Sequence, residues 1–160
     1  QTFGAYTDDK ELIDRLVLHY RDVTNELSEL GLKAYPGAKE TIKYLKTKGC
    51  KIGVVTSKLN DVATYHLKLT DLLEDIDLLV GFDDCEKHKP HPDPLLKAIE
   101  LLGSTKENTI YIGDHENDIK AAKKAGIESC AVTYSSRLKE MLAQQPEYVI
   151  DDLENLRDIV

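Results

Sequence analysis

The stretch Thr109-Ile-Tyr-Ile-Gly-Asp-His-Glu-Asn-Asp-Ile119 runs from a short apolar segment straight into an alanine-rich segment that ends at Gly126. The β-branched and aromatic residues at its start predict a buried strand. The residues from Ile119 onward predict a helix, because Gly126 supplies a signal for helix termination. A strand that leads directly into a helix is half of a βαβ unit, so this stretch indicates an α/β protein with a parallel sheet.

The same alternation continues on both sides of this stretch. Residues 51–56 form a nearly continuous apolar run that ends in hydroxyl side chains, as expected of a buried parallel strand. Asp93 and Pro94 suit the cap and first turn of a helix that ends at Gly103. The sequence therefore predicts a three-layer α/β sandwich, a mostly parallel sheet with helices on both faces. Further strands are expected at 76–80, 130–134 and 148–150, and further helices at 36–48, 61–69, 137–143 and 153–159.

Residues 9–31 break this rhythm, because they predict one long helix and no strand. Apolar side chains recur there at three- and four-residue steps from Leu12 to Leu30, which is the spacing of one helix face. We therefore expect two parts, an accessory helical segment at 1–33 and an α/β core at 34–160.

The composition is that of an ordinary globular domain. Of the 160 residues, 41% are hydrophobic and 31% are charged, which argues against disorder and fibrous repeats. The 21 basic and 29 acidic residues give a net charge of −8, so nucleic acid is not an expected partner. The apolar runs are too short to cross a bilayer, and the 3 widely spaced cysteines fit a reducing, cytoplasmic compartment. The sequence carries no signal of an oligomeric state.

Two carboxylates stand where the strand at 109–113 meets its helix. Asp114 and Asp118 are four residues apart, so both face one side of the first helical turn. Two like charges at this spacing are unfavourable unless a cation or the helix N-terminus compensates them, and carboxylates with water suit Mg²⁺. Helix capping explains the same two residues equally well. Gly113 adds to the metal interpretation, because a glycine allows a ligand to approach the backbone closely.

Polar groups also follow two of the other expected strands, at the sheet edge where ligands of parallel sheets bind. Thr56 and Ser57 offer hydroxyl and N–H groups next to a helix N-terminus, which is an anion site by geometry and also an ordinary cap. Lys89 lies in a stiff loop with Pro90 and Pro92, where its ammonium group could neutralise a phosphoryl group. A solvent-exposed loop lysine is the plainer explanation, and Lys87 is expected to be one.

In this order the three strand ends resemble the haloacid dehalogenase superfamily of phosphohydrolases. Val54-Val-Thr-Ser-Lys58 is similar to its second motif, Lys89-Pro-His-Pro92 to its third, and Gly113-Asp-His-Glu-Asn-Asp118 to its fourth, G-D-x-x-x-D. Tyr35-Pro-Gly37 and Gly81-Phe-Asp-Asp84 resemble the phosphoglycolate phosphatase branch and its pyrophosphatase relatives. The resemblance covers the chain from about residue 3 to its end.

The resemblance implies a Rossmann-like core that carries a Mg²⁺-dependent phosphatase site. Thr56 would bind the transferring phosphoryl group, assisted by the N–H of Ser57, and Lys89 would stabilise the phosphoryl and nucleophile charges. Asp114 would ligate Mg²⁺, and Asp118 would hold a metal-bound water or Lys89. Residues 1–33 would contain the rear part of a helical cap that closes over the site. The implied partner is a small phosphorylated metabolite, a monoester similar to phosphoglycolate, with pyrophosphate and sugar or nucleotide phosphates as alternatives.

The family's first motif, D-x-D-G-T, has no counterpart in the sequence. Its first aspartate is the nucleophile that forms an aspartyl-phosphate, and the only D-x-D, Asp75-Ile-Asp77, precedes a strand instead of following one. We therefore expect the nucleophile, the acid/base aspartate and their central strand to lie upstream of Gln1. If the chain is complete, the resemblance implies instead a non-catalytic phosphate-binding protein.

Two other interpretations are open. The spacing Cys85-x-x-His88-x-x-His91 offers three ligands for a transition metal, although a closed zinc site needs a fourth. A flavodoxin-like receiver domain also combines acidic strand ends, Mg²⁺ and a lysine, but it predicts a shorter chain without the helical segment at 9–31.

Overall fold

The computed structural model describes residues 7–160, apart from the side chains of residue 21 and residues 25–30. Within this range the chain divides between Lys33 and Ala34 into two compact units. The first unit contains α1 (Lys10–Gly31), which confirms the helix expected at 9–31. Asp9 begins it by accepting a hydrogen bond from the Leu12 N–H at 3.2 Å. The apolar stripe predicted at residues 27 and 30 lies outside the described side chains.

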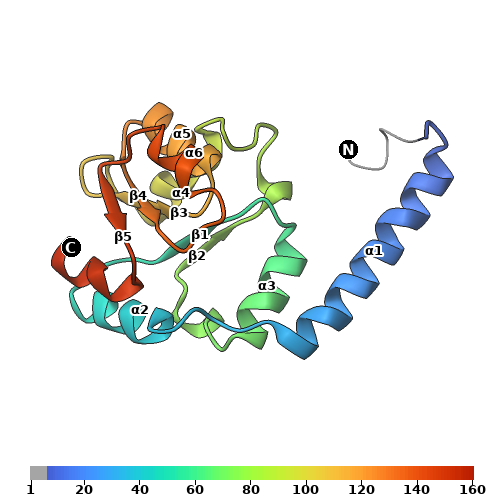
Figure 1. Ribbon diagram of the computed structural model, residues 1–160, viewed down its shortest axis with the longest axis horizontal. Helices are drawn as coiled ribbons and strands as arrows, with labels where there is room; N and C mark the ends of the chain where they lie inside the picture. Colours follow the sequence, from blue (N-terminus) through green and yellow to red (C-terminus); the bar gives the residue numbers. More distant parts are fainter. Residues whose placement is uncertain (1–6) are drawn as a thin grey trace. The chain divides into compact units, whose positions relative to one another are not determined.

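The second unit is an α/β core in which every strand pair is parallel (Figure 1). β1 (Gly53–Val55) pairs with β2 (Leu78–Val80) in one sheet. A second sheet has the order β3 (Ile110–Gly113), β4 (Glu128–Val132), β5 (Tyr148–Ile150). The parallel sheet expected from the sequence is therefore confirmed, but it is divided into two parts.

The helices alternate with these strands as predicted. The α-helices of the core are α2 (Ala38–Thr47), α3 (Asn60–Leu69), α4 (Asp93–Leu102), α5 (Glu116–Ala125) and α6 (Leu138–Leu142). Short 3₁₀ helices are η2 (Leu73–Asp75), η3 (Phe82–Asp84) and η4 (Leu153–Asp158). The closing helix expected at 153–159 is present, and it is the 3₁₀ helix η4.

The strand expected at 130–134 was displaced by two residues at each end. β4 begins at Glu128, because the fully buried Ser129 is satisfied by Glu147, whose Oε2 accepts from both the Ser129 N–H and its hydroxyl at 2.7 Å. Tyr134 lies beyond the strand and stacks on Tyr35, with ring centroids 4.5 Å apart. A buried serine with a partner 18 residues away gives no local signal in the sequence, and the prediction therefore started too late.

Two apolar clusters cover opposite faces of the sheet of β3, β4 and β5, which confirms the layered arrangement. On one face Ile110 and Ile112 pack with Cys130, Val132 and residues of η4. On the other face Tyr111 packs against α4 and α5, whose buried alanines allow these helices to approach closely. Side chains alternate between faces along a strand, so consecutive residues of β3 serve the two clusters.

An apolar cavity of about 490 Å³ separates the two sheets. Gly53 and Val55 of β1 line one side, Ile110 and Ile112 of β3 line the other, and Leu95 of α4 closes part of it. α4 packs against β1, β2 and α5 and so joins the two halves of the core. The two strands that flank this cavity, β1 and β3, are each followed directly by polar residues that the sequence analysis singled out, Thr56 after β1 and Asp114 after β3.

Candidate active site

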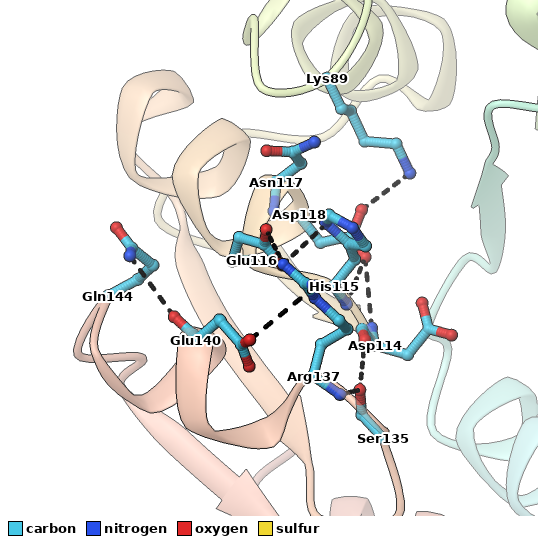
Figure 2. A network of polar contacts seen from close by, with 10 residues as sticks. All are labelled: Lys89, Asp114, His115, Glu116, Asn117, Asp118, Ser135, Arg137, Glu140 and Gln144. Atoms are coloured by element: carbon cyan, nitrogen blue, oxygen red, sulfur yellow. Dashed lines mark hydrogen bonds and ion pairs between the residues drawn. The ribbon is translucent and has the colours of Figure 1, made fainter. Parts of the chain in front are cut away.

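The Lys89 ammonium group joins the ends of β1 and β3. Its Nζ lies 3.0 Å from the carbonyl oxygen of Val55, the last residue of β1, and 2.9 Å from Oδ1 of Asp118 in the first turn of α5. Its third contact is the hydroxyl of Tyr111 in β3, at 2.9 Å. The loop that carries Lys89 thus reaches the carboxyl ends of both sheets at once, and Figure 2 shows its ion pair with Asp118.

Lys89 keeps its charge although its side chain is only 11% exposed. Burial by itself lowers the pKa of this lysine, and it is the largest single effect. The attraction of Tyr111 and Asp118 together outweighs it, so the pKa of Lys89 is raised above its ordinary value. A buried, fully hydrogen-bonded ammonium group is therefore fixed at this sheet edge.

Tyr111 is a site residue that the sequence analysis missed. Its hydroxyl donates to the Val55 carbonyl at 2.9 Å and accepts from Lys89, and its ring lies 5.4 Å from the lysine Nζ. Burial raises the pKa of Tyr111 to about 12, so the phenol stays neutral. The available signal was a lone phenol in an otherwise apolar strand, since a buried tyrosine hydroxyl needs a polar partner.

Asp118 is locked between the lysine and the loop backbone. While its Oδ1 pairs with Lys89, its Oδ2 accepts from the N–H groups of Asp114 and His115 at 3.2 and 3.1 Å. Its side chain is 8% exposed, and it closes a capping box at the start of α5. The capping interpretation is therefore correct for Asp118, which holds Lys89 as well.

The structure requires glycine at position 113, for a reason that the sequence analysis did not identify. A Cβ at this position would lie 2.3 Å from the Cβ of Asp118, too close for any other residue. The glycine therefore makes room for the Asp118 side chain.

Asp114 differs from Asp118, because its carboxylate is exposed and forms no hydrogen bond or ion pair with any described residue. Only its backbone groups are bonded, as Figure 2 shows. Among the side chains that the structure describes, no three His, Cys, Asp or Glu gather in a way that could hold a metal ion. Asp114 is thus the carboxylate that fits a hard cation such as Mg²⁺, which keeps several waters, whereas both oxygens of Asp118 are occupied. The Asp118 contact with Lys89 is the one that the resemblance implied for this residue, and the metal roles of the two aspartates stay predictions.

Thr56 and Ser57 follow β1 directly and precede α3. The Thr56 N–H donates to the Val80 carbonyl at 2.9 Å, and its hydroxyl accepts from the Lys58 N–H at 3.2 Å. The Ser57 side chain is exposed, and its N–H bonds to no group in the described chain. Since Lys89 touches the carbonyl immediately before Thr56, this polar segment lies beside the lysine.

The structure does not support a transition-metal site at Cys85, His88 and His91. Among the described residues these side chains do not form a metal-binding group. His88 stacks on Phe82 with ring centroids 3.7 Å apart, and Nδ1 of His91 lies 2.9 Å from Oδ1 of Asp93. Lys87 is exposed, as expected of a loop lysine.

These features define a Rossmann-like α/β core with a lysine and an unpaired carboxylate at the carboxyl ends of parallel strands. The chain belongs to the haloacid dehalogenase-like hydrolase family, whose model matches residues 1–132. The helical segment before the core also argues against the receiver-domain interpretation. Where the structure describes the chain, no helix combines the length and the apolar character needed to cross a membrane.

Individual proteins resemble the chain over most of its length. It is 38% identical over 153 residues to pyrophosphatase PpaX of Halalkalibacterium halodurans, a match that covers 95% of this chain and 71% of that protein. Pyrophosphatase PpaX of Bacillus mycoides is 35% identical, with the same two coverages of 95% and 71%.

A solved structure from Haemophilus somnus, named a predicted phosphoglycolate phosphatase, is similar with a TM-score of 0.74 and 28% identity. The match covers 78% of this chain and 56% of that one, so the chain spans little more than half of that relative. A haloacid dehalogenase-like hydrolase from Streptococcus pneumoniae has a TM-score of 0.79 at 21% identity, over 98% of this chain and 73% of that one, and it supports the fold alone.

Proposed function

We propose that this protein hydrolyses a phosphate ester or anhydride with Mg²⁺, through an aspartyl-phosphate on a nucleophile upstream of residue 1. The observation that carries the proposal is the buried Lys89 ammonium group, held between the end of β1 and Asp118, together with the unpaired carboxylate of Asp114, whose N–H bonds to the same Asp118. A fixed positive charge next to a metal-binding carboxylate is what a transferring phosphoryl group needs.

Each residue has a distinct part in this proposal. Thr56 and the Ser57 N–H would bind the phosphoryl group at the N-terminal end of α3. Lys89 would neutralise the negative charge that the phosphoryl group and the attacking carboxylate share. Asp114 would hold Mg²⁺, and Asp118 would orient Lys89 and contact the metal through water. When bound, the cation supplies charge neutralisation at the phosphoryl oxygens.

The cavity between β1 and β3 supports the position proposed for the nucleophile. We infer that one further parallel strand fills this space, because both flanking edges are parallel and the lining is apolar. The carboxyl end of such a strand would lie between Thr56 and Asp114, next to Lys89. A structure of the full-length protein tests this inference, and direct pairing of β1 with β3 there would contradict it.

Pyrophosphate is the substrate that the comparisons favour, because the relatives at 38% and 35% identity are named pyrophosphatases. This choice replaces the phosphoglycolate-like monoester that the sequence put first. The monoester remains a second candidate, supported by the similar structure named a predicted phosphoglycolate phosphatase. We propose that residues 1–33 belong to a cap that helps to select between them.

The test is a substrate panel on the full-length protein with Mg²⁺, comparing pyrophosphate, phosphoglycolate and p-nitrophenyl phosphate. Asp114→Asn is expected to abolish most of the turnover, because an amide binds the cation more weakly than a carboxylate. Asp151→Asn is a matched control, since Asp151 is exposed and far along the chain from these motifs. Unchanged turnover in Asp114→Asn would remove the metal role from Asp114.

A further inference from the structure

The loop that follows β4 is tied to the loop that carries Asp114. Ser135 lies in this loop, and its hydroxyl donates to the backbone carbonyl of Asp114. The same hydroxyl oxygen accepts from the Arg137 N–H at 2.9 Å. Because the Arg137 N–H occupies an acceptor position, the single hydroxyl proton of Ser135 is directed at the Asp114 carbonyl.

A second contact joins the loop after β4 to the start of α5. The Arg137 guanidinium group binds Glu116 in α5 with two contacts, Nε to Oε2 at 3.1 Å and Nη2 to Oε1 at 2.5 Å. This side-by-side pairing fixes both planes and is stronger than a single contact. The Glu116 side chain is 14% exposed, so solvent competes little for its oxygens. Figure 2 shows both ties converging on the segment from Asp114 to Asp118.

Together these bonds hold both polar backbone groups of Asp114. Its N–H donates to Asp118, four residues along the chain, and its carbonyl accepts from Ser135, 21 residues away on another loop. Its carboxylate has no partner among the described residues, so the backbone bonds are what fix the Cα from which that carboxylate extends. A ligand whose backbone is fixed in this way loses less freedom when it binds a cation.

We propose that Ser135 is a positioning residue, which holds the Asp114 carboxylate ready for a divalent cation. The proposal rests on the metal role given to Asp114 in the proposed function. It assigns the loop after β4, which none of the sequence motifs includes, to the construction of the metal site.

The chain offers a matched control in the next residue. Ser136 is exposed and bonds to nothing in the described range, so Ser136→Ala removes the same hydroxyl without touching Asp114. Ser135→Thr keeps a hydroxyl in place, and Arg137→Gln weakens the second tie while leaving Ser135 intact.

The experiment measures binding of Mn²⁺, as a stand-in for Mg²⁺, to the full-length protein by electron paramagnetic resonance. Ser135→Ala is expected to weaken Mn²⁺ binding about 10-fold, the usual scale for partners that orient a metal ligand. Ser136→Ala and Ser135→Thr should bind as the wild type does, and Arg137→Gln should show a smaller loss. In Ser135→Ala, turnover should recover at high Mg²⁺ with an unchanged KM for the substrate, which a general loss of structure would not produce.

Asp114→Asn separates the two proposals. If Mn²⁺ affinity does not depend on Asp114, the metal role in the proposed function is wrong, and the role of Ser135 falls with it. If affinity depends on Asp114 but is equal in Ser135→Ala and Ser136→Ala, only the positioning role is wrong. Should Ser135→Ala not fold, an unchanged affinity in Arg137→Gln together with a loss in Ser135→Thr would count against the proposal.

Discussion

The two sheets of the core differ in how completely they are packed. In the sheet of β3, β4 and β5, the central strand has four consecutive buried residues, from Ser129 to Val132. In the pair of β1 and β2, only Val80 is buried, and the other five residues are partly or fully exposed. The sheet of β3, β4 and β5 is therefore the more completely packed of the two. Both sheets border the cavity, and α4 packs against β1 and β2 as well as α5.

The two sides of the proposed site, one on each sheet, also differ in how many hydrogen bonds hold them. The fully packed sheet carries Asp114 and Asp118 on a loop whose backbone groups are bonded from two directions. The open pair carries Thr56 and Ser57, whose segment has few bonds. Lys89 joins the two, with one contact to the end of β1 and two contacts, to Tyr111 and Asp118, on the other side. The part of the site proposed to hold the metal therefore has more backbone hydrogen bonds than the part proposed to hold the phosphate, which Lys89 contacts at the Val55 carbonyl.

If Lys89 is the link between the halves, its loss should have the largest effect of any single change. Lys89→Met is expected to lower kcat on the order of 100- to 1,000-fold, because it removes the fixed charge opposite the phosphoryl group. The measurement is steady-state hydrolysis by the full-length protein, with circular dichroism to confirm folding. Lys87→Met is the control, and equal activities in the two variants would show that the link has no catalytic part.

The packing contrast predicts unequal losses of stability from core truncations. Met141→Ala, in the packed half where the side chain is fully buried, is expected to lower the free energy of unfolding by about 2–5 kcal/mol. Leu79→Ala in β2 should cost less, because that side chain is only partly buried. Urea denaturation of both variants measures the difference, and a larger loss in Leu79→Ala would reverse the comparison.

A smaller effect concerns how the free energy of unfolding depends on pH near the pair of β1 and β2. Asp77 precedes β2, and its hydrogen bond to Lys46 at 2.8 Å, with a second from the Ile52 N–H at 2.8 Å, lowers its pKa below 3.8. A lowered carboxyl pKa stabilises the fold fully above about 3.8, and this stability is lost as the pH falls through the lower, folded-state value.

Asp77→Asn should therefore cost about 1 kcal/mol or less at pH 7, since a third of the side chain is exposed. The difference in free energy of unfolding between this variant and the wild type should become smaller as the pH is lowered toward 3. Unfolding curves at several pH values measure it, with Asp151→Asn as the reference. If the difference in free energy of unfolding instead grew in acid, the ionised Asp77 carboxylate would not be what stabilises the contact with Lys46 of α2.

The sequence was most informative where a signal lies within a few residues. The strand at 148–150, the helix ended by Gly103 and the G-D-x-x-x-D junction were all predicted, because turn residues and apolar spacing act locally. The failures concern partners far along the chain. The buried Ser129 belongs to a strand because its hydroxyl bonds to Glu147, and Tyr111 is a site residue because its hydroxyl bonds to Lys89. Neither partner is close enough along the chain to give a local signal.

The sequence alone determined the class of fold, the alternation of strands and helices, and the residues on which a phosphatase site is proposed, because periodicity and short motifs encode these features. Only the tertiary structure decided that Asp118 holds Lys89 while the Asp114 carboxylate stays free, and that Ser135 bonds the Asp114 backbone. The two aspartates are the same residue type four positions apart. Their roles differ because separate loops reach one of them with an ammonium group and the other with a hydroxyl.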